Sequence, residues 1–214
     1  MEQRQFSLMD NLLGAADDAL RTVFGPAPRP ERESPAKNLE EAELSDTDRR
    51  RAGQFMRVDH AGEVCAQALY QGQALTARLP TVREKMQKAA DEENDHLAWT
   101  EERIRELGTH KSLLNPLWYA GSFAIGALAG AIGDKWSLGF VVETENQVME
   151  HLDGHLRELS PDDEKSRAIL ELMKEDEGRH ATTALNAGAA SFPAPVKTIM
   201  RLSSKLMTRT ALYI

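Results

Sequence analysis

Two copies of a Glu-x-x-His pattern are the residues of this chain best suited to do chemistry. Glu93 precedes His96 by three positions, and Glu177 precedes His180 by three. Residues i and i+3 of an α-helix share a face, so each pair directs a carboxylate and an imidazole to one place. A four-helix bundle with such a pair on two helices, and one glutamate on each of the others, holds a bridged pair of iron or manganese ions. The pattern predicts such a site if the chain supplies two more glutamates.

Glu63 and Glu145 are predicted to be those two glutamates. The height of a residue in a hairpin follows from its distance in sequence from the turn, at a rise of about 1.5 Å per residue. By this measure each glutamate lies within about one helical turn of the Glu-x-x-His pair on the other helix of its hairpin. Glu145 continues an apolar stripe, as Glu93 and Glu177 do on their helices. A carboxylate on such a stripe is costly unless it is paired, protonated or bound to metal. The predicted metal ligands are therefore Glu63, Glu93, His96, Glu145, Glu177 and His180.

Neighbouring acids and histidines are predicted to support these ligands rather than to join them. A ligand histidine usually donates its second N–H to a carboxylate. Asp176, which the helical rotation directs sideways, is predicted to reach the ring of His96. His151 is a second candidate for this supporting role. The glutamates that fall off the apolar stripes are Glu92, Glu143 and Glu150.

The elements that must position these residues are predicted to be two antiparallel helical hairpins, because the turn within each is short. Ser45 is a plausible N-cap for the first helix, and Thr81 with Glu84 forms a capping box for the second. Gly108 is expected just beyond the end of the second helix, and Ser160 is expected to cap the fourth. The expected helices cover about 47–79, 81–108, the residues up to about 159, and 160–188.

Residues 112–133, between the two hairpins, contain no charged side chain. Their length approaches that of a membrane span, but Pro116 and the glycines that follow favour packing against protein equally. A full span would place the two hairpins of one metal site on opposite sides of a bilayer. A full span is therefore less favoured, and a helix that is buried, interfacial or inserted into the membrane stays open.

The last residues, 195–214, combine apolar side chains with a regular series of basic ones. The basic residues recur at every fourth position and are Lys197, Arg201, Lys205 and Arg209. A basic amphipathic helix on an acidic body predicts contact with a membrane surface. The alternative is that this helix packs on the acidic bundle.

Composition narrows the class of protein. The length of 214 residues suggests one folded domain, which we expect at 46–214. The N-terminal segment, 1–45, is expected to contain an amphipathic helix over 6–24 and then a proline-rich linker. The net charge of −8 argues against nucleic-acid binding. The mean hydropathy of −0.48 argues against an integral membrane protein. A single cysteine argues against a disulfide framework or a thiolate metal site.

Several motifs resemble those of the 5-demethoxyubiquinone hydroxylases of ubiquinone biosynthesis. The resemblance runs from about Arg57 to the C-terminus, and is carried by RVDHAGE at 57–63, YQGQ at 70–73 and the two Glu-x-x-His pairs. The chain departs from the family at Glu143-Thr144-Glu145, where the family usually has adjacent glutamates. Helical phase selects Glu145 of these two as the ligand.

The resemblance implies an all-α, ferritin-like four-helix bundle made of two hairpins, with an apolar crossover helix and a C-terminal amphipathic helix. It implies that the six ligands hold two iron ions (Fe²⁺/Fe³⁺). It also implies that the protein uses O₂ to hydroxylate the quinol ring of a prenylated demethoxyubiquinol. A homo-oligomer or a complex of biosynthetic proteins would be compatible with it.

Two other functions stay open at this point. A rubrerythrin-like peroxidase or ferroxidase would use the same ligands, and a non-catalytic lipid-binding protein would explain the apolar segments but not the ligands. The N-terminus shows no secretory signal or transit peptide. We expect a peripheral membrane protein on the cytoplasmic face of the cell membrane.

Overall fold

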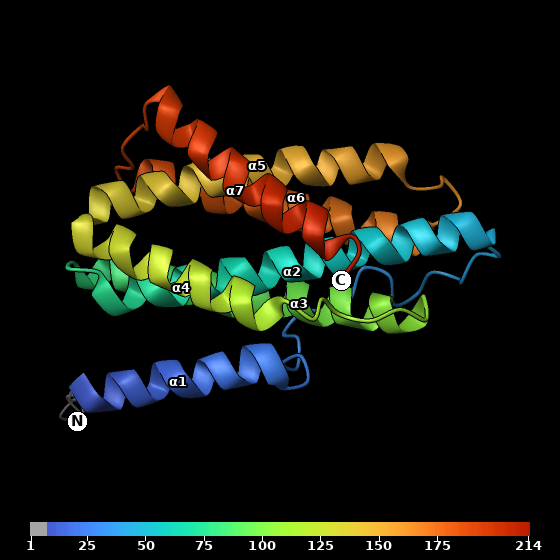
Figure 1. Ribbon diagram of the computed structural model, residues 1–214, viewed down its shortest axis with the longest axis horizontal. Coiled ribbons are helices and arrows are strands. Elements are labelled where there is room, and N and C mark those ends of the chain that lie inside the picture. Colours follow the sequence, from blue (N-terminus) through green and yellow to red (C-terminus); the bar gives the residue numbers. More distant parts are fainter. Residues whose placement is uncertain (1–7) are drawn as a thin grey trace.

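The computed structural model describes residues 8–214, and every regular element among them is a helix (Figure 1). The predicted all-α class is confirmed. The predicted start of the first helix at residue 6 lies outside the described residues. The helices are α1 (Leu8–Phe24), α2 (Asp46–Thr76), α3 (Pro80–Glu106), α4 (Asn115–Ile132), α5 (Asp134–Glu158), α6 (Glu164–Asn186) and α7 (Ala194–Ala211).

Helices α2, α3, α5 and α6 form the bundle. The hairpin of α2 and α3 packs against the hairpin of α5 and α6, through contacts of α3 with α6 and of α2 with α5. Two apolar clusters fill the interior, one around Phe55 and the other around Tyr70. Both of these residues are on α2, where Glu63 lies between them. The predicted ligands therefore occupy a polar layer between two apolar ones.

The ends of the first hairpin follow local backbone rules. Ser45 caps α2, and its hydroxyl accepts a hydrogen bond from the N–H of Asp48 at 3.1 Å, as predicted. Helix α2 ends at Thr76, short of the predicted residue 79. The N–H groups of Arg78 and Leu79 instead donate to the carboxylate of Asp134. After α3, Gly108 adopts a φ of 72°, and the N–H of Thr109 reaches the carbonyl of Ile104, which is the glycine-terminated end the sequence predicted.

Two predicted caps are wrong. Helix α3 begins at Pro80 without a side-chain cap, so the capping box of Thr81 and Glu84 does not form. Proline at the first helical position brings a preset φ and has no N–H to satisfy. Helix α6 begins at Glu164 rather than after Ser160, and Asp163 caps it by accepting from the N–H of Ser166 at 3.1 Å.

The uncharged segment forms α4, which packs lengthwise on α2. A Cβ placed on Gly126 would collide with the carbonyl of Leu69, and one on Gly72 would collide with the carbonyl of Phe123. Glycine on both helices thus permits backbone contact. The opposite face of α4 exposes Leu117, Leu128 and Ile132, among others. Within residues 8–214 no helix has the length and apolar character needed to cross a membrane.

The C-terminal helix α7 lies across the bundle on the same side as α4 (Figure 1). The Lys197 ammonium is 2.7 Å from a carboxylate oxygen of Glu143, and Arg201 is 3.6 Å from Glu150. Part of the basic series therefore packs on the acidic bundle, which is the alternative the sequence left open. Exposed apolar residues remain along α7, namely Ile199, Leu202 and Leu206.

Candidate metal centre

The six predicted ligands are brought together in the interior of the bundle. Two groups of side chains offer donor atoms that all lie within 4.8 Å of one another. They share Glu177, which comes from the middle of α6. The first group consists of Glu63, Glu93, His96 and Glu177, and the second of Glu145, Glu177 and His180.

Glu93 and Glu177 stand between the two histidine rings. Nδ1 of His96 is 2.9 Å from Oε2 of Glu93 and 3.3 Å from Oε1 of Glu177. Nδ1 of His180 is 3.1 Å from Oε2 of Glu177 and 3.3 Å from Oε1 of Glu93. Each of these carboxylates therefore offers one oxygen to each ring, which is the arrangement that bridges a pair of metal ions.

The other two glutamates lie at opposite ends of the group. Oε2 of Glu63 is 3.6 Å from Nδ1 of His96. Glu145 belongs to the His180 group, and its carboxylate accepts a short hydrogen bond from the hydroxyl of Tyr70. Glu143 points elsewhere, since it accepts from the side chain of Gln147 and pairs with α7. The choice of residue 145 over 143 by helical phase agrees with these contacts.

The outer nitrogens of both rings bond to acids on the opposite hairpin. Nε2 of His96 is 2.9 Å from Oδ2 of Asp176, and Nε2 of His180 is 2.7 Å from Oε2 of Glu92. Each acid immediately precedes one of the two glutamates that stand between the rings, so the two contacts are related by the internal repeat. An acid at Nε2 favours the form of the ring that carries a proton there, which leaves Nδ1 directed into the cluster.

The role of Glu92 was missed by the sequence reasoning, although the signal was present. The argument that directed Asp176 toward His96 applies equally to Glu92, because both residues immediately precede a bridging glutamate. Glu92 was excluded from the ligands because it lies off the apolar stripe. Its position one residue before Glu93 rotates its side chain by about 100° around the helix axis, toward the neighbouring helix.

His151, the second residue predicted to support the ligands, contacts Asp59 at 3.7 Å and packs against the ring of His155.

Burial and charge determine the protonation of the cluster in the metal-free protein. Burial, followed by repulsion from Glu93, raises the pKa of Glu63 well above its ordinary value. Burial and then the charge of Glu177 do the same to the pKa of Glu145. Burial opposes the charge of His180, but hydrogen bonds to Glu177 and Glu93 outweigh it and raise its pKa to about 12. Protons thus balance the charge of the cluster in the absence of metal.

The side chains fit divalent metal ions. Oε2 of Glu63 is buried and accepts no hydrogen bond from the described residues. Leaving such atoms without a partner is costly unless a cation meets them. Four carboxylates and two imidazoles, without a thiolate, form a donor set suited to iron or manganese in a helical bundle.

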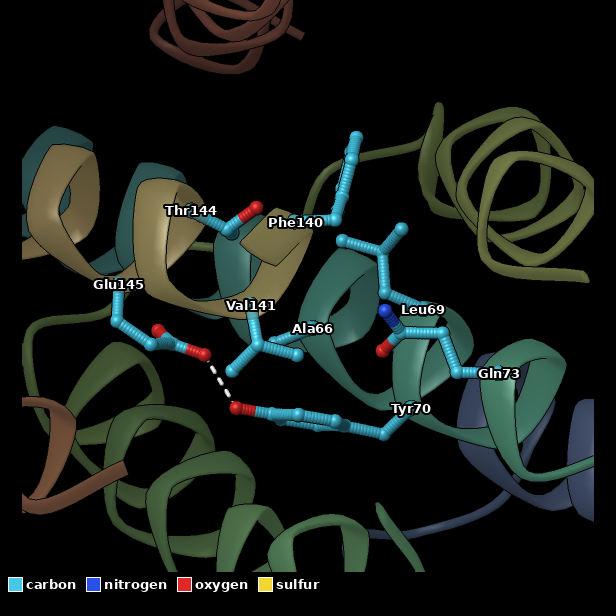
Figure 2. A pocket seen from close by; sticks show the side chains of 8 residues that line it. All are labelled: Ala66, Leu69, Tyr70, Gln73, Phe140, Val141, Thr144 and Glu145. Atoms are coloured by element: carbon cyan, nitrogen blue, oxygen red, sulfur yellow. Dashed lines mark hydrogen bonds between the residues drawn. The ribbon is translucent and has the colours of Figure 1, made fainter. Parts of the chain in front are cut away.

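Tyr70 lies between two openings toward this cluster. Figure 2 shows a narrow apolar gap between α2 and α5, with the bond between Tyr70 and Glu145 at its base and Leu69 and Phe140 beside it. A cavity of about 180 Å³ lies on the other side, at the His180 end. Its lining includes Tyr70, Met86, Leu138, Val141, His180 and Thr183.

The fold and the site define a four-helix-bundle protein with a buried, carboxylate-rich site of the metal-binding type. Residues 50–211 match the family model described as ubiquinone biosynthesis protein COQ7. The chain therefore belongs to the COQ7 family, which confirms the resemblance of its motifs. It is an enzyme, a hydroxylase of ubiquinone biosynthesis.

Individual relatives and a solved structure agree with this assignment. The chain is 58% identical over 214 residues to a 3-demethoxyubiquinol 3-hydroxylase of Nitrosococcus oceani, with both chains fully covered. It is 60% identical over 207 residues to the enzyme of that name from Stutzerimonas stutzeri, covering 97% of this chain and 96% of the relative. The fold is similar to a bacterioferritin-related thioferritin from Bacteroides fragilis, with a TM-score of 0.55 and 17% identity over 72% of this chain and 89% of that one.

Proposed function

We propose that the six clustered residues hold two iron ions, and that the protein uses them to hydroxylate 3-demethoxyubiquinol with O₂. The observation that carries the proposal is the placement of Glu93 and Glu177, each with one oxygen toward His96 and the other toward His180. Relatives at 58% and 60% identity are hydroxylases of this quinol. The peroxidase or ferroxidase alternative has no such support.

In this proposal each half of the site has its own terminal ligands. Glu63 and His96 would hold one ion, and Glu145 and His180 the other, with the remaining two glutamates shared between them. Two ferrous ions would supply the electrons and binding positions needed to activate O₂. Overall, one oxygen atom would enter the ring and the other would leave as water. The quinol would return the two electrons that the irons give to O₂, so the product would be the hydroxylated quinone.

The protein's own side chains orient the ligands and admit the substrate. Asp176 and Glu92 hold the protons of the outer ring nitrogens, which keeps both Nδ1 atoms free to bind metal. Tyr70 holds the carboxylate of Glu145 by its hydroxyl. The cavity beside His180 has apolar walls at Met86, Leu138 and Val141 and is bordered by Lys85, Lys88 and Glu92. We propose that the quinol ring approaches the site there.

The test is a measurement of metal content and oxygen transfer on the purified protein. We expect two iron ions per chain, and one atom of ¹⁸O from ¹⁸O₂ in the product formed from reduced demethoxyubiquinol. A strain that lacks the gene should accumulate the demethoxy quinone. Purified protein that holds a single zinc ion, or hydroxylates equally well after iron removal, would show the proposal to be wrong.

We also propose peripheral contact with the cytoplasmic face of a membrane, through α4 and α7. Both helices lie on the same side of the bundle (Figure 1). Leu128 of α4 and Leu202 of α7 are each 62% exposed, and a prenylated quinol resides in the bilayer. The basic residues of α7 would add attraction to anionic lipid.

Substitution tests this contact better than truncation, because Ala211 at the end of α7 is buried and the carbonyl of Leu212 accepts from Arg57. We expect wild-type protein to float with phosphatidylglycerol-containing vesicles. A Leu202→Asp, Leu206→Asp double variant should float less while its helicity is unchanged. Equal flotation of both proteins would contradict the contact.

A further inference from the structure

The segment before the bundle is packed rather than loose, although its proline-rich sequence predicts a linker. Ala36 and Leu44 are buried in the apolar cluster around Phe55. Glu41 pairs with the buried Arg103 at 2.6 Å. These contacts hold residues 25–45 along the bundle, upstream of the part of the chain that matches the family model.

Arg32 is the residue of this segment that reaches deepest toward the metal cluster. Its Nε is 2.6 Å from Oδ2 of Asp95, and its Nη2 is 2.7 Å from Oδ2 of Asp176. The guanidinium also lies 5.0 Å from the centre of the Trp99 ring. The indole of Trp99 donates to the carbonyl of Arg32 at 3.4 Å. Arg32 is therefore held by two ion pairs, by the contact of its guanidinium with the Trp99 ring, and by the hydrogen bond that its carbonyl accepts.

Each of these three partners also touches His96 or adjoins it in the chain. Asp95 immediately precedes His96, and the Trp99 ring lies 5.6 Å from the imidazole. Oδ2 of Asp176 is bonded to Nε2 of His96 at 2.9 Å, so this oxygen meets both the histidine and Arg32. Asp95 and Asp176 have side chains only 4% and 1% exposed, and buried carboxylates of this kind need a compensating charge. Arg179 pairs with Oδ1 of Asp176 at 2.5 Å, so Arg32 is the cation that meets the oxygen bonded to His96.

We infer that Arg32 is a positioning residue that fixes Asp176, and through it the ring of His96, in the orientation needed to bind metal. The inference rests on the proposed function, in which His96 is a ligand. The planar fork of arginine can bond two carboxylates at once in fixed directions, which a lysine cannot do. A segment outside the bundle thus completes one half of the site.

The experiment measures binding of Mn²⁺ to metal-free protein by the decrease of the free-ion EPR signal. Arg32→Ala and Asp176→Asn should each weaken binding by roughly ten- to a hundred-fold, the usual cost of losing a partner of a ligand histidine. The double variant should bind within about twofold of Asp176→Asn alone, because both changes break the same chain of contacts. Arg32→Ala combined with Glu92→Gln should bind more weakly than either single variant.

The controls separate positioning from a general effect on folding. Lys37→Ala removes an exposed cation from the same segment, paired with Glu33, and should bind Mn²⁺ as wild type does. If Arg32→Ala fails to fold, Arg32→Gln serves instead, and Arg32→Lys should recover only part of the affinity. Wild-type affinity in Arg32→Ala, or an equal further loss in the Asp176→Asn background, would overturn the inference. Wild-type protein that binds fewer than two ions would instead contradict the proposed function.

Discussion

The His96 half and the His180 half of the site use the same local geometry but are enclosed differently. In each half, an acid that precedes a bridging glutamate bonds to the outer nitrogen of the histidine. Asp176 in the His96 half is buried beneath Arg32. Glu92 in the His180 half is 32% exposed, with Lys88 at 3.6 Å, and it borders the cavity. One half is closed by the N-terminal segment, and the other borders a cavity.

This difference indicates a division of roles between the halves. The closed half has its ring fixed by buried charges, so it is suited to retain its ion. The open half has a partner that water can reach and an adjoining cavity with both apolar and charged walls, so its surroundings can change as substrate enters. The predictions below test that division, beginning with the change that affects both halves.

Replacing the shared glutamate Glu177 with alanine should have the largest effect. Both ions lose a ligand, so we expect metal affinity to fall by more than the roughly hundred-fold upper end seen for outer partners, and hydroxylation to cease. Metal analysis and product assay check this result. Glu175→Ala, an exposed change two positions earlier, should be silent. A Glu177→Ala protein with full activity would rule out the shared role.

The two outer acids should differ in importance. Asp176→Asn should weaken metal binding by about ten- to a hundred-fold, because the lost charge is buried between Arg32 and His96. Glu92→Gln should cost less than about tenfold, since water can replace an exposed partner. Parallel Mn²⁺ titrations measure both. Equal losses in the two variants would mean that enclosure does not distinguish the halves.

A rise in pH should lower the stability of the metal-free protein and raise its affinity for metal. The raised pKa values of Glu63 and Glu145 mean that the folded metal-free protein retains protons that the unfolded chain releases above about pH 4.3. That stability is present at low pH and is lost as pH rises. The raised pKa of His180 likewise makes the folded protein lose stability as pH rises above about 6.5. The Tm of metal-free protein should therefore fall between pH 6 and 9.

Metal affinity should rise over the same pH range. Each ion must displace protons from its ligands, so affinity increases by about tenfold per pH unit for each proton released. Thermal unfolding after chelation and Mn²⁺ titrations at several pH values give the two slopes. Glu63→Gln and Glu145→Gln should each flatten both slopes. A Tm of the metal-free protein that increases with pH would contradict this account.

Filling the cavity should have the smallest effect and should be confined to the open half. Thr183→Trp places a large side chain at the cavity, and we expect kcat/KM for the quinol to fall by about tenfold or less while metal binding stays normal. Thr182→Trp, one position away and also exposed, is the matched control. Equal losses in both variants would indicate a surface effect rather than a blocked approach.

The repeated ligand pattern could be read from the sequence because it depends on local geometry. The i, i+3 spacing of Glu93 and His96 specifies a shared helical face regardless of what packs against it, and apolar periodicity selects Glu145 over Glu143. The cap at Ser45 and the helix end at Gly108 are local in the same way. The caps at Thr81 and Ser160 do not form because α3 already begins at Pro80 and because Asp163, rather than Ser160, caps α6.

Tertiary structure alone decided how the two halves are enclosed. The contact of Arg32 with Asp176 joins residues 144 positions apart, and no periodicity in a proline-rich segment indicates where its side chains will lie. The packing of α4 on α2 likewise depends on glycines that happen to face each other across two helices. Helical phase specifies the direction of a side chain, but the partner it meets depends on which distant segment packs there.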